Sequence, residues 1–220
     1  MKFDDEIKSV FISSVSSSPF MRFLCHFVPF QIPSVFTCTF CRFCFDAEGL
    51  TKSIGICNAS IKKMSDLIAE CEKAGIPKPG NLQIELHPYL QQDKVVRFCK
   101  DHDIVVTAAM PLGSPERPPR FRREDDPVIM DDPELKAIAA ECGYSVAQII
   151  IRWHLQRGIV AIPKGTEEWM IQENFETLNF KLTMEQMERI NAVDRHFRFG
   201  RGEVMFWREN QKWEELFDYE

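Results

Sequence analysis

The first fifty residues lack tyrosine and tryptophan altogether, although they hold ten of the eighteen phenylalanines and four of the eight cysteines of this 220-residue chain. A phenolic acid or an indole ring therefore cannot come from this part of the sequence. From Gly49 onward the composition becomes that of an ordinary α/β protein. We therefore predict an atypical Phe/Cys-rich segment over residues 1–48, outside the fold of the remainder, and one domain over 49–220.

The chain also lacks an excess of positive charge. Its net charge is -6 and its isoelectric point is near 5.5, so no basic surface for nucleic acid or anionic lipid is expected. A basic stretch followed by an apolar one is missing at the N-terminus, so no secretory signal is predicted. Cysteines without paired spacing (Cys57, Cys71, Cys99 and Cys142) are typical of reduced thiols, and we expect a cytoplasmic protein.

Residues 19–45 are apolar but lack the uninterrupted run of about 20 residues that a membrane-spanning helix needs. Arg22, Pro29 and Arg42 interrupt them, so no membrane contact is predicted. Cys38-x2-Cys41-x2-Cys44 resembles part of an iron–sulfur ligand run, but the fourth cysteine and its proline are missing. A metal-binding module ranks last among the alternatives, and no metal ligand is assigned.

From Gly49 onward, short apolar runs alternate with helical patterns, which is typical of parallel βα units. The third run is nearly all β-branched, and it predicts a strand buried on both faces. The last twenty-five residues predict an irregular tail over the rim of the sheet. The expected strands are 52–56, 82–86, 104–108 and 159–163, and the expected helices lie near 61–74, 91–101, 133–142, 146–157, after 166, and after Thr183.

The stretch Ile159–Thr166 predicts a buried strand that ends at Pro163-Lys164 and leads into a helix. A lysine ammonium and a helix N-terminus at the end of a parallel strand can hold an anion. The connection from Met110 to Met130 is long for a βα loop and rich in proline, arginine and aspartate. Such loops carry function or are disordered, and its charges fit a solvated surface equally well.

Four motifs occur in one order and spacing: Gly49–Asn58, Gln83–Leu90, Pro111–Pro115, and Ile162-Pro-Lys-(x8)-Glu-Asn-Phe175. Together they resemble the aldo-keto reductase family over about residues 49–200. That family is a TIM barrel whose members reduce aldehydes and ketones with NADPH. The resemblance implies an α/β fold derived from the TIM (β/α)8 barrel, with about four βα units that match strands five to eight.

The resemblance also implies roles for seven residues in binding NADP(H). Asn58 and Gln83 match residues that hold the nicotinamide carboxamide, and Leu112 and Ser114 match the loop that folds over the pyrophosphate. Lys164 matches the residue that binds the 2′-phosphate, and Glu173 and Asn174 match residues that contact adenine. Each residue also has a purely structural interpretation. Asn58 and Gln83 could be a polar pair inside a barrel whose hydrogen bonds are satisfied. Lys164 could be an ordinary surface lysine, and Glu173-Asn174 could lie on a solvated helix face.

Several positions depart from the family pattern. Ala109 replaces a tyrosine that stacks on the nicotinamide, and Met110 and Gly165 replace serines near the phosphates. Met170 stands where an arginine would pair with the 2′-phosphate, and Cys57 replaces a serine before Asn58. Because lysine alone cannot reproduce the paired hydrogen bonds of arginine, the resemblance implies weak cofactor binding.

No catalytic residue is assigned. In the family, the general-acid tyrosine and its lysine, aspartate and histidine partners come from the first four strands. None of Tyr89, Tyr144 and Tyr219 occupies such a position. We therefore expect a truncated, inactive relative of carbonyl oxidoreductases. The alternative is a non-catalytic half-barrel protein that associates with itself through open sheet edges.

Overall fold

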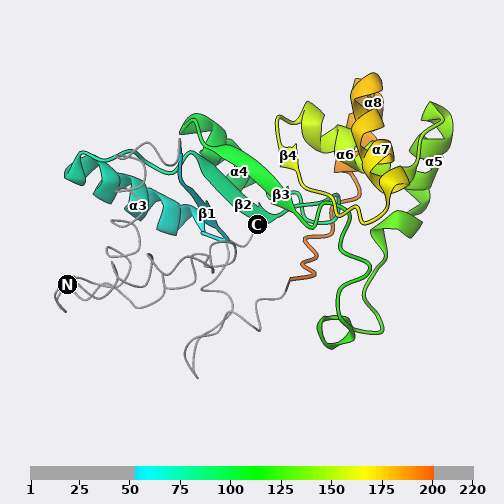
Figure 1. Cartoon of the computed structure of the whole chain (residues 1–220), viewed down its shortest axis with the longest axis horizontal. Coiled ribbons are helices and arrows are strands. Elements are labelled where there is room, and N and C mark those ends of the chain that lie inside the picture. The colour runs from blue at the N-terminus through cyan, green and yellow to red at the C-terminus, as the bar shows by residue number, and fades with distance from the viewer. Residues whose placement is uncertain (1–52, 201–220) are drawn as a thin grey trace.

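The computed structural model describes residues 53–200, which form one parallel sheet with helices packed against it (Figure 1). The sheet has the order β1-β2-β3-β4, and every neighbouring pair is parallel. This arrangement confirms the predicted α/β fold of four βα units. The strands are β1 (Gly55–Cys57), β2 (Asn81–Glu85), β3 (Val105–Ala109) and β4 (Val160–Ala161).

Helices follow the strands, and their ends lie where capping residues place them. The long helix α3 begins after Ser60, whose side chain accepts a hydrogen bond from the backbone of Lys63, and it ends at Gly75 with φ 64°. Gly143 ends α5 in the same left-handed conformation. The helices are α3 (Ile61–Ala74), α4 (Asp93–Asp101), α5 (Pro133–Cys142), α6 (Val146–Gln156), α7 (Glu168–Glu176) and α8 (Met184–Asn191).

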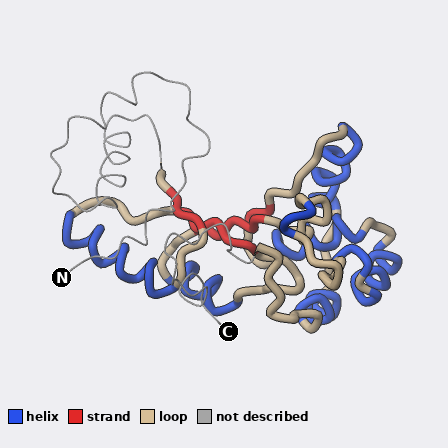
Figure 2. Tube along the Cα trace, turned by 90° about the horizontal axis from the view of Figure 1, so that it is seen from below, coloured by secondary structure: helices blue, strands red, loops and turns tan. Residues whose placement is uncertain are grey.

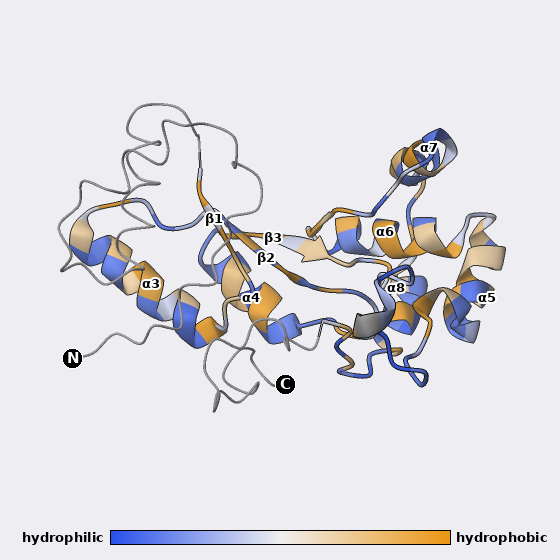
Figure 3. Cartoon of the chain, turned by 60° about the horizontal axis from the view of Figure 1, so that its bottom comes forward, coloured by the Kyte–Doolittle hydropathy of each residue, from blue (hydrophilic) through white to orange (hydrophobic). Residues whose placement is uncertain are grey.

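The two faces of the sheet differ in what covers them. Helices α3 and α4 lie on one side of the strands (Figures 2 and 3). The side chains that point toward them are apolar and buried, since alternate strand residues face alternate sides. The other face carries both polar and apolar side chains, and Asn81 Nδ2 donates to Thr107 Oγ1 across it at 2.8 Å. The buried set on the helix side is Ile56, Leu82, Ile84, Val106 and Ala108.

The C-terminal helices extend the core beyond the sheet. Helix α6 begins with a capping box between Ser145 and Gln148, and α8 with one between Thr183 and Gln186, as the sequence predicts for α8. The flanking Leu182 and Met187 are both buried. Figure 3 shows α7 at the margin of this group, next to α6.

The prediction that β3 is buried on both faces holds only in part, because Val106, Thr107 and Ala108 are buried but Val105 at the start of the strand is 48% exposed. The predicted strand 159–163 is only two residues long in β4, and Val160 is 45% exposed. Within residues 53–200, β4 pairs with β3 alone, so its outer edge and its open-face side chains have no neighbouring strand. Strand β1 begins at Gly55, later than predicted.

A carboxylate fixes the described part of the tail at the rim of the sheet. Glu85 accepts hydrogen bonds from the backbone N–H groups of Phe199 at 2.6 Å and Gly200 at 2.9 Å, and its Oε1 lies 3.0 Å from His87 Nε2. Burial disfavours ionisation, but His87, Arg198 and the backbone donor outweigh it and lower the pKa of Glu85. The predicted rim position is thus confirmed for residues up to 200.

Other predictions fall outside the described residues. These are the apolar stretch 19–45, the cysteine run Cys38, Cys41 and Cys44, and the tail from residue 201. Between residues 53 and 200 no helix is long and apolar enough to cross a membrane. In the same range, Cys57, Cys71, Cys99 and Cys142 form no disulfide bonds.

Candidate functional site

A cleft of about 690 Å³ lies between the long loop after β3 and the segment from β4 to α7. Side chains far apart in the sequence form its walls, because the parallel strands β3 and β4 end at the same edge of the sheet. Five of the seven residues predicted to bind the cofactor line this cleft: Leu112, Ser114, Lys164, Glu173 and Asn174.

The loop from Met110 to Met130 is built from turns and two short 3-10 helices, Pro119–Phe121 and Ile129–Asp131. Gly113 has φ 75°, and a Cβ there would lie 2.8 Å from Ile129 and 2.9 Å from Phe199, so this close approach requires glycine. Arg117 holds the loop together, since it donates to the carbonyls of Gly113, Ser114 and Phe121 and pairs with Asp126. The loop is therefore a wall of the cleft, which favours the functional interpretation of its length.

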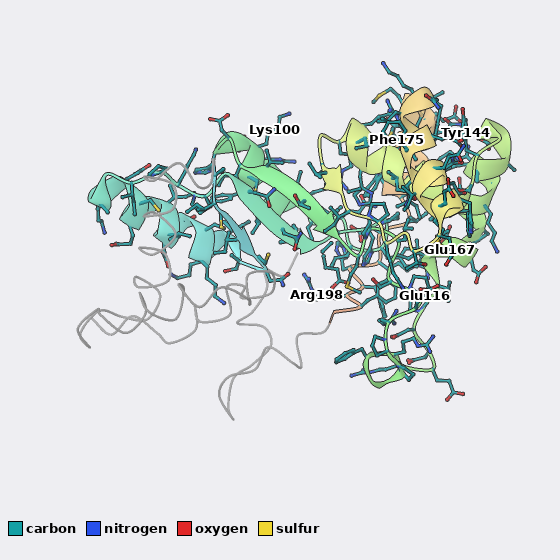
Figure 4. All side chains as sticks on the ribbon, viewed as in Figure 1. Lys100, Glu116, Tyr144, Glu167, Phe175 and Arg198 are labelled. Carbon is teal, nitrogen blue, oxygen red and sulfur yellow. The ribbon has the colours of Figure 1, made fainter. Side chains whose placement is uncertain are left out.

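Lys164 lies at the mouth of the cleft, where its Nζ is 2.7 Å from Glu116 Oε2 of the facing loop. Glu116 and Glu167, which precedes α7, lie on the same side of the molecule (Figure 4). The nearby ammonium lowers the pKa of Glu116. Both side chains of the pair are about two-thirds exposed, at 68% and 67%. An exposed pair of this kind contributes little stability, so an anionic ligand can displace Glu116 from Lys164.

Helix α7 supplies the other wall of the cleft. The carbonyl of Glu173 accepts from Gln148 Nε2 of α6 at 3.1 Å, and the carbonyl of Asn174 accepts from Thr177 Oγ1 at 2.8 Å. These bonds use backbone atoms, so both side chains stay available to a ligand. Trp169 and Met170 from the first turn of α7 line the same wall. A Cβ on Gly165 would lie 3.2 Å from Ile171, so even a serine there requires a small adjustment.

Asn58 and Gln83, the other two predicted residues, are neighbours of each other but do not line the cleft. The backbone N–H of Asn58 donates to the carbonyl of Gln83 at 2.9 Å, and the Cys57 thiol lies 3.5 Å from Gln83 Oε1. Asn58 has φ 51°, a left-handed conformation that asparagine tolerates better than most residues. Both residues are half-buried. The structure therefore separates the predicted residues into two groups.

Neither described tyrosine faces the cleft. Tyr89 is buried and donates its hydroxyl to Asp132 Oδ2 at 2.7 Å, and burial together with this carboxylate raises the pKa of the phenol. Tyr144 stacks on Phe180 with ring centroids 3.9 Å apart. Both rings thus serve packing, and neither can protonate a ligand in the cleft.

Three arginines and three aromatic side chains of the cleft were not predicted. Arg117, Arg122 and Arg123 come from the loop, with Phe121, while Trp169 comes from α7 and Phe199 from the tail. The signal that points to them is the run Arg117-Pro-Pro-Arg-Phe-Arg-Arg123, which concentrates positive charge in an acidic chain. Sequence periodicity could not place this run, because an irregular loop has no fixed side-chain spacing.

Comparisons with known proteins agree with these observations. A sequence model described as "Aldo/keto reductase family" matches residues 22–195, beginning upstream of Gly49. The chain is 39% identical over 152 residues to "Aldo-keto reductase family 1 member A1" of Xenopus tropicalis, covering 69% of this chain and 45% of that protein. It is 40% identical over 159 residues to an aldo/keto reductase of Synechocystis, covering 72% of this chain and 47% of that protein. The chain thus spans about half the length of the relatives it matches.

Proposed function

The chain belongs to the aldo/keto reductase family, and on that premise we propose that its cleft binds the adenosine 2′-phosphate end of NADP(H). The observation that carries the proposal is the convergence of Leu112, Ser114, Lys164, Glu173 and Asn174 on one cleft from three separate segments. Lys164 provides the positive charge for phosphate, and Trp169 and Phe121 provide apolar surfaces for the adenine ring.

NADPH would supply the hydride that reduces an aldehyde or ketone in the family's reaction. This chain's own residues support the binding part of that reaction better than the chemical part. Asn58 and Gln83 present amide groups suited to the nicotinamide carboxamide, yet Ala109 offers no ring for stacking. A positioned general acid contributes roughly 10²–10⁴-fold to such a reaction. Tyr89 and Tyr144 are committed to packing, so we propose that the chain alone binds cofactor weakly and does not catalyse carbonyl reduction.

The test combines a binding assay with a turnover assay on the purified 220-residue chain. NADPH titrated against the protein should quench tryptophan fluorescence, because Trp169 lines the cleft. The same protein mixed with NADPH and 4-nitrobenzaldehyde should oxidise no cofactor above the blank, whereas a full-length active reductase assayed in parallel should. Absence of NADPH binding would overturn the binding proposal, and turnover above the blank would overturn the proposed inactivity.

The exposed apolar surface of α7 and β4 favours a second candidate, an interaction function. Helix α7 buries none of its residues within the described part of the chain, and Ile171 and Phe175 are 60% and 73% exposed. Ile162, just after β4, is also half exposed. Such clustered apolar surface is typical of an interface. The partner we propose is a second copy of the chain. Strand β4 of each copy can pair with β1 of the other copy around a twofold axis, and the two sheets together then have eight strands.

Size-exclusion chromatography with light scattering tests this candidate. The parent chain should behave as a dimer, and the double variant Ile171→Ser/Phe175→Ser should behave as a monomer. Met184→Ser is the matched control, because this α8 residue is an apolar side chain that is 75% exposed and does not belong to α7. A parent chain that stays monomeric and soluble contradicts the interaction function without affecting the cofactor proposal.

A further inference from the structure

The wall of the cleft that α7 forms has lost positive charge. Met170 lines it where the family pattern places an arginine, and its sulfur lies 4.0 Å from Thr166 Oγ1. Lys164 is the one cation that the β4–α7 side contributes to the cleft within residues 53–200. A phosphate carries a charge of about −1.5 to −2 at neutral pH, so one exposed lysine leaves about a third to a half of it unbalanced.

The opposite wall of the cleft, which the loop after β3 forms, carries positive charge. Arg117, Arg122 and Arg123 all line the cleft from the loop that faces Lys164. The salt bridge between Lys164 and Glu116 spans the cleft mouth, so the loop lies within reach of the β4–α7 wall. The acidic side chains in the lining are Glu116 and Glu173, and the cationic ones outnumber them.

Arg117 is not available to a ligand. Its guanidinium donates to three backbone carbonyls, pairs with Asp126, and lies 4.6 Å from the centre of the Phe199 ring. Its side chain is 9% exposed. Arg117 therefore shapes the loop and supports the residues that follow it.

Arg122 and Arg123 differ from Arg117 because both are exposed. Arg122 Nη1 donates to the carbonyl of Pro115 at 3.3 Å, a contact with an uncharged acceptor that leaves its charge uncompensated there. The backbone N–H of Arg123 donates to Asp126 Oδ2 at 2.9 Å, which fixes the loop beneath the two side chains. They also border a second hollow of about 370 Å³, where Glu124 and Asp126 lie.

We propose that Arg122 and Arg123 bind the 2′-phosphate of the cofactor together with Lys164, and so replace the arginine that is missing at position 170. Discrimination between NADPH and NADH then resides in the loop after β3 and not in α7. The guanidinium group suits this role because its planar donors bind two phosphate oxygens at once. The inference rests on the proposed function, since it concerns the same cleft and the same ligand.

The test uses adenosine 2′,5′-bisphosphate and 5′-AMP, which differ only in the 2′-phosphate, with calorimetry on the full chain. In Arg122→Ala/Arg123→Ala the dissociation constant for the bisphosphate should rise about tenfold or more, and that for 5′-AMP should change less than about twofold. The matched control is Lys94→Ala/Arg97→Ala, which removes two exposed charges from α4, away from the cleft. The control should bind both probes as the parent does.

A second variant, Arg122→Lys, keeps the charge but loses the fork of donors, so it should show an intermediate loss for the bisphosphate alone. Equal unfolding midpoints for all variants would show that the fold is retained. If the parent binds the bisphosphate and the double variant binds it equally well, this inference is overturned while the proposed function stands. If the parent binds neither probe, both are overturned, and an equal loss for both probes also overturns the phosphate role.

Discussion

Helices α6 and α7 are consecutive in the chain and similar in length, yet they have opposite relations to the core. Helix α6 buries seven of its residues, whereas α7 buries none within the described part of the chain. The partners of α6 come from both sides of the fold. Trp153 Nε1 donates to Asn191 Oδ1 of α8 at 2.8 Å, and His154 Nε2 lies 3.1 Å from the carbonyl of Leu86, just after β2.

Within the described part of the chain, α7 lacks buried side-chain contacts of this kind, and its apolar side chains are exposed instead. Its main contacts in the described structure are with α6 and the short turn at Thr177–Asn179. The difference indicates that α6 stabilises the fold, while α7 presents side chains to a ligand or a partner. Stability and binding should therefore respond to different substitutions, and four experiments examine this division.

The largest difference is expected between Trp153→Ala and Phe175→Ala. Trp153 is fully buried in α6, so its truncation should lower the free energy of unfolding by about 3–5 kcal/mol. Phe175 is 73% exposed, and its truncation should change that free energy by less than about 0.5 kcal/mol. Urea denaturation followed by circular dichroism measures both, and Trp153→Phe serves if the alanine variant does not fold. Similar losses in the two helices would refute the division.

His154 should make the contribution of α6 depend on pH. Burial lowers the pKa of His154 to about 4 from an ordinary value of 6.5, although the carbonyls of Ile150 and Leu86 oppose the shift. Between these two pKa values the unfolded chain binds a proton at His154 that the folded chain does not bind. The contribution of His154 to the free energy of unfolding is therefore fully present above pH 6.5 and is lost as the pH falls toward 4.

Between pH 7.5 and pH 5 the loss from this group should be about 2 kcal/mol. His154→Gln should remove that part of the pH dependence, although it lowers stability at every pH. Denaturant unfolding at several pH values measures the slope, with His196→Gln as the control, since His196 is exposed. An unchanged slope in His154→Gln would contradict the assignment.

The sequence predicts the helices of this fold well because their ends carry strong local signals. Ser60 and Gly75 bound α3, and Thr183 with Gln186 starts α8, as the structure confirms. Strands were predicted in the right order but with less accurate lengths. The exposure of Val105 and Val160 depends on which strands lie beside them, and residue preferences carry no information about that.

The candidate site was predictable where a family motif exists, and less so elsewhere. Lys164 and Asn174 lie in one cleft because the motif after β4 corresponds to a fixed piece of structure. Arg122 and Arg123 lie in an irregular loop, where neither periodicity nor a motif indicates the direction of a side chain. The separation of Asn58 and Gln83 from the cleft is a property of the three-dimensional arrangement that linear spacing does not contain.

Removal of the lysine at the cleft mouth should affect binding but not folding. Lys164→Met should raise the dissociation constant for adenosine 2′,5′-bisphosphate about tenfold, because a charge-assisted hydrogen bond is lost. Its side chain is 68% exposed, so the unfolding midpoint should stay unchanged. Calorimetry and thermal unfolding on the same samples measure the two effects. A stability loss comparable to that of Trp153→Ala would show that this side of the molecule also stabilises the fold.

The smallest effect is expected at Glu116, which forms an ion pair with Lys164 when no ligand is bound. Glu116→Gln removes the charge that competes with phosphate, so the bisphosphate should bind about two- to fivefold more tightly, in keeping with the modest strength of an exposed ion pair. Salt screens such pairs, so the gain should diminish as ionic strength rises. Glu124→Gln is the matched control, because this loop residue borders the second hollow and not the cleft. Equal gains in both variants would indicate a general effect of loop charge, whereas a gain confined to Glu116→Gln would show that ligand and Glu116 compete for the same lysine.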